Sequence, residues 1–189
     1  MMAMKSGSPA EVIRPIGHAE LDAFMGYLED QMADNGENGT PLFQPSPRGA
    51  PWIASDKVGP FRLGIDIPVG QPRWRRSWCA HDGSGAIVGH VDLRAHDESL
   101  TSHRALLGMG VHRAHRRRGL GGALVRHALG WAQQATTLEW IDLSFLGGNL
   151  PAERLYRSAG FTVVGTVPDR FRIDGLPVDE ISMARRIDR

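Results

Sequence analysis

The stretch MGVHRAHRRRGLGGALV, residues 109–125, joins two apolar segments through a basic, glycine-rich turn. Residues 103–111 (HRALLGMGV) predict a strand that runs into it. The segment after it predicts a helix, because apolar side chains recur there at helical spacing, at Leu120, Leu124, Ala128, Trp131 and Ala135. The first turn of a helix offers backbone N–H groups without internal partners, and glycines let an anion approach them closely. The turn is therefore either a cradle for a phosphorylated ligand or, on its arginines alone, a nucleic-acid patch or localisation tag.

Composition limits the class of protein. The chain has 189 residues, enough for one domain, and its 22 basic and 21 acidic residues give a net charge of +1, which disfavours a dedicated nucleic-acid binder. The one cysteine, Cys79, excludes an internal disulfide, a CxxC pair and a multi-cysteine zinc site, and its place in an expected strand favours a buried residue over a nucleophile. We expect a cytoplasmic protein. Residues 1–10 contain no signal-peptide core, and we expect them to form a flexible tail before a domain at 11–189. The sequence has no apolar stretch of about 20 residues, so it does not predict a membrane span.

The rest of the chain alternates expected strands and helices. Residues 11–16 predict a strand and residues 18–32 a helix, and two strands flank the turn DGSG at 82–85. Residues 138–146 predict a strand, residues 149–160 a short capped helix, and residues 162–168 and 177–187 two final strands. Residues 35–72, the excursion, contain seven prolines and predict irregular structure with one short helix near 55–63, because proline at this density opposes a long helix. The order predicts an α/β layer with a central sheet.

Two segments together carry a resemblance to a known family. The turn fits neither the Walker loop nor the dinucleotide fingerprint, but it contains R-x-x-G-x-G between Arg116 and Gly121. Together with NLPAERLYRSAGF (residues 149–161), which comes one strand later, it resembles the GNAT superfamily of N-acetyltransferases over residues 11–189, apart from the excursion. The resemblance implies a single-domain fold with a mixed, mostly antiparallel sheet of about six to seven strands flanked by helices. It also implies transfer of an acetyl group from acetyl-CoA to a primary amine by direct attack in a ternary complex.

The resemblance assigns cofactor roles to both segments. The backbone of Met109 and Val111 would pair with the pantetheine arm, N–H groups of residues 116–121 would bind the pyrophosphate, and Asn149 would hydrogen-bond the cofactor or serve only as a helix cap. Arg113, Arg117 and Arg118 would contact the 3′-phosphate or remain solvated. The full expected cofactor set is Met109, Gly110, Val111, Arg116, Arg117, Arg118, Gly119, Leu120, Gly121, Gly122, Asn149, Ala152 and Tyr156.

The resemblance also implies an acid but leaves the base open. Tyr156 matches the tyrosine that relatives use as general acid, where a phenol protonates the departing thiolate. Relatives carry a glutamate that acts as general base at one of two positions, which are Ala105 and Ser144 in this chain. The remaining candidates for the base are Asp142, Asp92 and His103, with a chain of water molecules as an alternative.

The acceptor is an unidentified small-molecule or peptide amine. By resemblance, the first helix and the excursion form the acceptor side, where three aromatic residues would line a pocket: Phe43, Trp52 and Phe61. The histidines show no metal-binding spacing, so we expect no metal. A homodimer is left open, no membrane partner is expected, and nucleic acid is disfavoured. The alternatives are a non-catalytic acyl-CoA-binding module, which the missing glutamate suggests, and a nucleic-acid-binding module built on the arginines.

Overall fold

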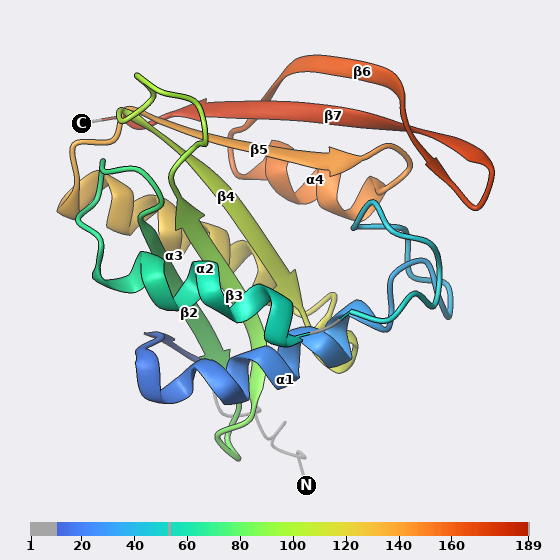
Figure 1. The fold of residues 1–189 in the computed structure, drawn as a ribbon, viewed down its shortest axis with the longest axis horizontal. Coiled ribbons are helices and arrows are strands. Elements are labelled where there is room, and N and C mark those ends of the chain that lie inside the picture. Colours follow the sequence, from blue (N-terminus) through green and yellow to red (C-terminus); the bar gives the residue numbers. More distant parts are fainter. Residues whose placement is uncertain (1–10, 53, 189) are drawn as a thin grey trace, which may run out of the picture.

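The computed structural model describes residues 11–52 and 54–188, and they form a seven-stranded sheet in the order β1-β2-β3-β4-β5-β7-β6 (Figure 1). Neighbouring strands are antiparallel except β4 and β5, which are parallel. This confirms the predicted fold class, while the expected tail at 1–10 lies outside the described residues. The elements are β1 (Val12–Pro15), α1 (Leu21–Met32), α2 (Ala54–Asp66), β2 (Arg75–His81), β3 (Ile87–Arg94), β4 (Arg104–Val111), α3 (Leu120–Ala135), β5 (Trp140–Leu146), α4 (Leu150–Ser158), β6 (Thr162–Ile173) and β7 (Leu176–Arg186), with 3-10 turns at His18–Glu20 and Arg113–His115.

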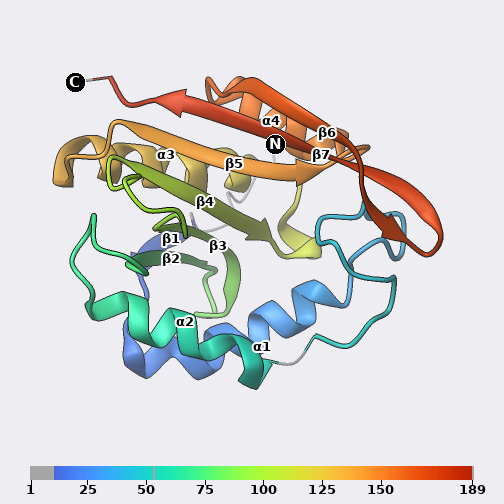
Figure 2. The same ribbon diagram turned by 45° about the horizontal axis from the view of Figure 1, so that its top comes forward.

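Helices cover both faces of the sheet, α3 and α4 on one and α1 and α2 on the other (Figure 2). The predicted apolar stripe of α3 is buried against the first face, where Leu124 and Ala128 are fully buried. On the second face Phe24 and Leu28 of α1 pack with Cys79 of β2, which is fully buried as the sequence indicated. Two apolar cores therefore hold the sheet between helical layers.

The sheet divides between its two parallel strands. β4 and β5 pair at only three positions, from Arg104↔Trp140 to Leu106↔Asp142. Beyond these, β4 continues to pair with β3, and β5 continues to pair with β7, so the two strands diverge toward the right of Figure 1. We call the gap between residues 107–111 and 143–146 the wedge. Strand edges inside the wedge lack a neighbouring strand and can pair with an extended ligand.

The excursion is ordered around one buried side chain. The Asn35 amide oxygen accepts hydrogen bonds from the N–H groups of Phe43 (2.8 Å) and Gln44 (3.0 Å), and its amide nitrogen donates to the Gln44 carbonyl (3.1 Å). Farther along, Arg48 forms an ion pair of 2.7 Å with Asp174 in the β6–β7 turn. The excursion thus extends from the end of α1 to the last hairpin.

The helix expected near 55–63 is longer than predicted, because α2 spans Ala54–Asp66 with Pro60 inside it. A proline in a helix interior removes one backbone hydrogen bond, which is why the sequence argued for a shorter element. Packing compensates for this loss, since Val58, Phe61 and Ile65 lie against the core formed with α1. Tertiary burial therefore decides the length of this helix.

Candidate active site

A cleft of about 1510 Å³ includes the wedge and the face of the sheet next to α1 and α2. Most residues expected from the sequence line it: Phe43, Trp52, Phe61, Asp92, Met109, Gly110, Val111, Arg116, Arg117, Gly119, Gly121, Gly122, Asn149, Ala152 and Tyr156. Four others do not belong to its lining: Arg118, Leu120, His103 and Asp142. Leu120 is 4% exposed, so its side chain belongs to the core.

The β4 edge of the wedge presents backbone groups. His112 donates its N–H to Val88 of β3 (2.9 Å), and successive residues of a strand direct their backbone groups to opposite sides. Met109 and Val111 therefore direct theirs away from β3 and toward the wedge. The Val111 carbonyl already accepts a hydrogen bond from Nε of Arg116 (3.0 Å).

The glycine turn is shaped for close approach to the start of α3. Gly119 precedes the helix with a φ of 87°, which favours glycine, and Arg117 also has a positive φ of 61°. The first N–H that closes the helix is that of Ala123, which donates to Gly119 (3.1 Å). The N–H groups of the three residues before it have no partner within the helix. Gly119, Gly121 and Gly122 add no side chain over these groups, so the turn fits an anionic ligand.

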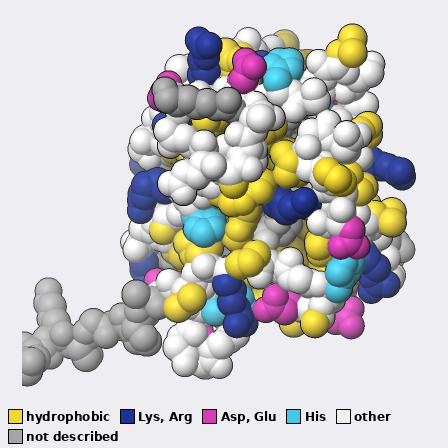
Figure 3. Space-filling view, turned by 90° about the vertical axis from the view of Figure 1, so that its left-hand side faces the viewer, with side chains coloured by type: hydrophobic (Ala, Val, Ile, Leu, Met, Phe, Trp, Pro, Cys, Tyr) yellow, Lys and Arg dark blue, Asp and Glu magenta, His cyan; other side chains and the backbone are white. Residues whose placement is uncertain are grey.

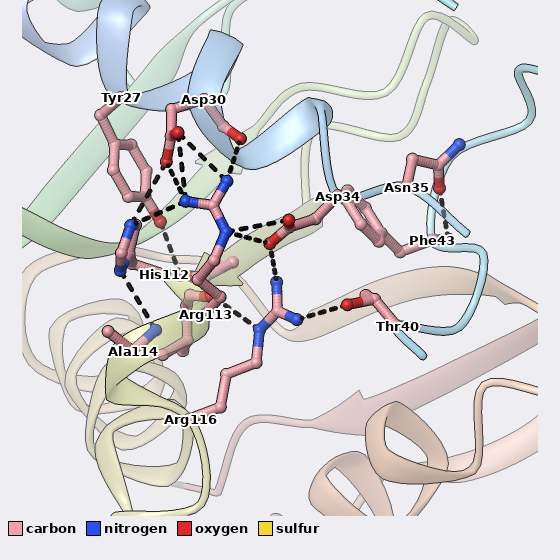
Figure 4. Close-up of polar contacts among 12 residues, drawn as sticks. Tyr27, Asp30, Asp34, Asn35, Thr40, Phe43, His112, Arg113, Ala114 and Arg116 are labelled. Atoms are coloured by element: carbon pink, nitrogen blue, oxygen red, sulfur yellow. Dashed lines mark hydrogen bonds and ion pairs between the residues drawn. The ribbon is translucent and has the colours of Figure 1, made fainter. Parts of the chain in front are cut away.

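Two arginines of this stretch, Arg113 and Arg116, are bound by groups of the protein itself (Figure 4). Arg113 binds Asp34 through Nε (2.9 Å) and Asp30 through Nη1 (3.0 Å), and Arg116 binds Asp34 (3.2 Å) and the hydroxyl of Thr40 (3.0 Å). Both guanidinium groups therefore attach the turn to the end of α1. The Arg116 side chain, which occupies the motif position, is therefore held by groups of the protein itself.

The start of α4 and its buried tyrosine form the other wall. Asn149 caps α4, accepting a hydrogen bond from the Ala152 N–H (3.2 Å) and donating one to the Leu42 carbonyl of the excursion (3.3 Å). Tyr156 is 7% exposed and its ring lies 6.0 Å from that of Phe145. Burial raises the pKa of Tyr156 to about 12, so its hydroxyl stays protonated at neutral pH and can donate a proton.

The sheet face that α1 and α2 cover carries several charged side chains. Asp92 is 4% exposed, and its Oδ1 contacts both Nη1 of Arg94 (3.1 Å) and Nε of Arg75 (3.4 Å). The Arg75 guanidinium also lies over the ring of Phe61, 3.9 Å from its centroid. Burial lowers the pKa of His90, next along this face, to about 4, so His90 is neutral at pH 7.

Two of the three base candidates lie away from the cleft lining. Asp142 accepts hydrogen bonds from Nε of Arg104 (2.7 Å) and from His96 (2.9 Å). His103 is exposed, just before β4. Asp92 lines the cleft but is held by its two arginines.

Sequence reasoning missed many polar residues of this cleft, including Gln31, Asp34 and Glu180. A Cβ at Gly110 would lie 1.8 Å from Nε2 of Gln31, so glycine there makes room for that side chain. Asp34 carried a weak signal, because it lies four residues after Asp30 at the end of a predicted helix. No local sequence pattern pointed to Glu180, because only the pairing of β7 with β5 brings it to the cleft.

Residues 11–52 and 54–188 contain no group of three or more His, Cys, Asp or Glu side chains placed to hold a metal ion. The helices described in that range are too short or too polar to cross a membrane. On the face shown in Figure 3, Lys and Arg side chains are scattered among acidic and histidine side chains around a central apolar band.

Comparison with known proteins connects this geometry to a family. The L-amino acid N-acetyltransferase AaaT of Escherichia coli (strain K12) is 30% identical over 101 residues, which are 53% of this chain and 62% of that protein. An acetyltransferase of the GNAT family from Streptococcus pneumoniae superposes with a TM-score of 0.77 at 20% identity, covering 95% of this chain and 100% of that one. A GNAT superfamily phosphinothricin acetyltransferase from Sinorhizobium meliloti, solved with acetyl-CoA, gives 0.72 at 18% identity, covering 94% and 88%.

At these identities the two structures establish likeness of fold. The match that decides the family is to the model of the acetyltransferase (GNAT) family, which covers residues 50–161, more than half of the chain. This range includes β4 and β5, which border the wedge, together with the glycine turn and α4. The chain belongs to the acetyltransferase (GNAT) family.

Proposed function

We propose that this protein transfers the acetyl group of acetyl-CoA to the amine of a small molecule that also carries an anionic group. The observation that carries the proposal is the wedge, which combines an unpaired strand edge with the glycine turn at its open end. The edge suits the extended pantetheine arm, and the N–H groups at the start of α3 suit its pyrophosphate. Family membership supports the same assignment.

The charge of the cleft supports an anionic acceptor. Arg75 and Arg94 share the single carboxylate of Asp92, which leaves one positive charge in excess in a largely buried site. Burial and the neighbouring Arg94 lower the pKa of Arg75, so a further anion would be stabilised beside it. The name of the Escherichia coli relative, an L-amino acid N-acetyltransferase, describes an acceptor with both an amine and a carboxylate.

The chemistry follows from groups on opposite sides of the wedge. A neutral amine attacks the thioester carbonyl, and the C–S bond breaks as the C–N bond forms. Tyr156 lines the cleft and its hydroxyl is protonated at neutral pH, so it can supply the proton that the departing thiolate needs. Phe43, Trp52 and Phe61 line the same cleft and provide apolar surface for the body of the acceptor.

The cofactor assignment is tested by placing a negative charge in the glycine turn. Gly121→Glu puts a carboxylate beside the unpaired N–H groups, and we expect acetyl-CoA binding to be lost in titration calorimetry. Gly130→Glu adds the same side chain to the same helix at a position where a Cβ meets nothing within 4 Å, and it should bind normally. Equal affinity of the two variants would overturn the pyrophosphate assignment.

The acceptor class is tested by CoA release with matched amines. Each standard L-amino acid is compared with the amine that its decarboxylation would give. A charge-assisted contact contributes about 1.5–3 kcal/mol, so we expect about 10- to 100-fold higher kcat/KM for the carboxylate-bearing partner. Equal values would refute the anionic subsite, and no release with any amine would refute catalysis in favour of a binding module.

A further inference from the structure

The carboxylates that line the cleft differ in how they are held. Among the described residues they are Asp34, Asp92 and Glu180. Each of the two aspartates lies within 3.4 Å of two arginine side chains, which occupy its carboxylate oxygens. Glu180 is held differently: its Oε1 accepts a hydrogen bond from the Ser144 hydroxyl (3.0 Å).

The charged neighbour of Glu180 is more distant. Nε of Arg170 on β6 lies 3.6 Å from Oε2, beyond hydrogen-bonding distance, on a side chain that is 57% exposed. Water screens an exposed pair of this kind. On β5 the next acidic side chain on the same face is Asp142, which is neutralised by Arg104. Among the described carboxylates that line the cleft, Glu180 is therefore the one without an arginine nitrogen within 3.5 Å.

Strand pairing places Glu180 on the acceptor side. Its Cα is paired with Leu146 of β5, so it shares a sheet face with Leu146 and Ser144. Phe145 points to the other face, where its ring meets Tyr156 of α4. Glu180 and Tyr156 thus approach the cleft from opposite faces of the sheet, with the carboxylate on the side of α1 and α2 and the phenol on the side of α4.

We propose that Glu180 is the general base, positioned by Ser144; this rests on the proposed function. Its carboxylate takes one proton from the acceptor ammonium, so an N–H bond breaks and an O–H bond forms. The neutral amine then forms the C–N bond as the C–S bond of the thioester breaks. The thiolate takes the Tyr156 proton, and Tyr156 recovers the second proton lost by the nitrogen. The proton on Glu180 leaves to water with the products.

The test compares two glutamates of matched exposure. Glu180 and Glu153 have side chains 27% and 28% exposed, and each has an arginine nearby, but Glu153 is not part of the cleft lining. CoA release is measured for wild type, Glu180→Gln and Glu153→Gln, with the fastest acceptor among the standard L-amino acids and spermidine. We expect Glu180→Gln to lower kcat/KM about 100-fold or more at pH 7, while Glu153→Gln stays within about twofold.

The pH profile separates a base from a structural role. Without a base, Glu180→Gln can use only the neutral amine, so its kcat/KM should rise about tenfold per pH unit up to the pKa of the acceptor. Wild type should show a plateau over the same range. A parallel profile in the two proteins, or equal activity, would overturn the assignment. Unchanged acetyl-CoA affinity in Glu180→Gln confirms that the fold is intact, and an inactive wild type would instead refute the proposed function itself.

Discussion

Acid should destabilise this protein through His90, a buried residue of β3 that is 7% exposed. Burial lowers its pKa from about 6.5 to about 4, helped by Arg75 and Arg94 and opposed by Asp92. Between these two values the unfolded chain binds a proton that the native protein does not. The stability contributed by the neutral histidine is therefore complete above about pH 6.5 and is lost as the pH falls toward 4. Linkage gives a loss of about 2 kcal/mol between pH 7 and pH 5.

Urea unfolding at both pH values, followed by tryptophan fluorescence, measures this loss. Other groups titrate too, so the comparison is with His90→Asn, whose amide does not titrate and can still bond the Tyr27 hydroxyl, which lies 3.4 Å from Nδ1 of His90. We expect wild type to lose about 2 kcal/mol more than the variant on acidification. An equal loss in the two proteins would refute the reasoning, because His90 would then not be held neutral by burial.

Two further predictions concern the walls of the cleft. Tyr156→Phe should lower kcat about 100-fold or more with little change in acetyl-CoA affinity, because it removes a proton donor and keeps the ring; CoA release and calorimetry measure both, and an unchanged kcat contradicts the acid role. Asp34→Asn should reduce the free energy of unfolding by about 1–3 kcal/mol, because Arg113 and Arg116 lose a charged acceptor on a side chain that is 6% exposed. Asp30→Asn, at 50% exposure, should cost less than about 1 kcal/mol in the same urea titration, and equal costs would argue against this ranking.

The fold followed from local patterns because each element carries its own signal. The apolar stripe of α3 and the Asn149 cap of α4 are properties of consecutive residues, and the structure contains both. The length of α2 was underestimated because Pro60 dominates a local pattern, whereas burial of Phe61 against α1 is a tertiary effect. The wedge could not be predicted from the sequence either, because it depends on which strand each strand edge pairs with.

The candidate site shows the same limit more sharply. Ser144 and Glu180 are 36 residues apart and meet only because β5 pairs with β7. Arg116 was expected beside the cofactor from its motif position, yet its guanidinium bonds to Asp34, 82 residues earlier in the chain. Backbone roles, such as that of Gly119, are easier to foresee because a positive φ is a local requirement.

The excursion connects the two halves of the site mechanically. Its Thr40 bonds to Arg116 beside the glycine turn, its Leu42 bonds to Asn149 at the cap of α4, and its Phe43 lines the cleft. A displacement of this segment by one substrate would therefore alter the surface offered to the other. Such coupling is reciprocal, so acetyl-CoA and the acceptor would change each other's affinity by the same factor. The irregular segment that was least informative in the sequence therefore links the two walls of the cleft, and this link predicts coupling between the two substrates.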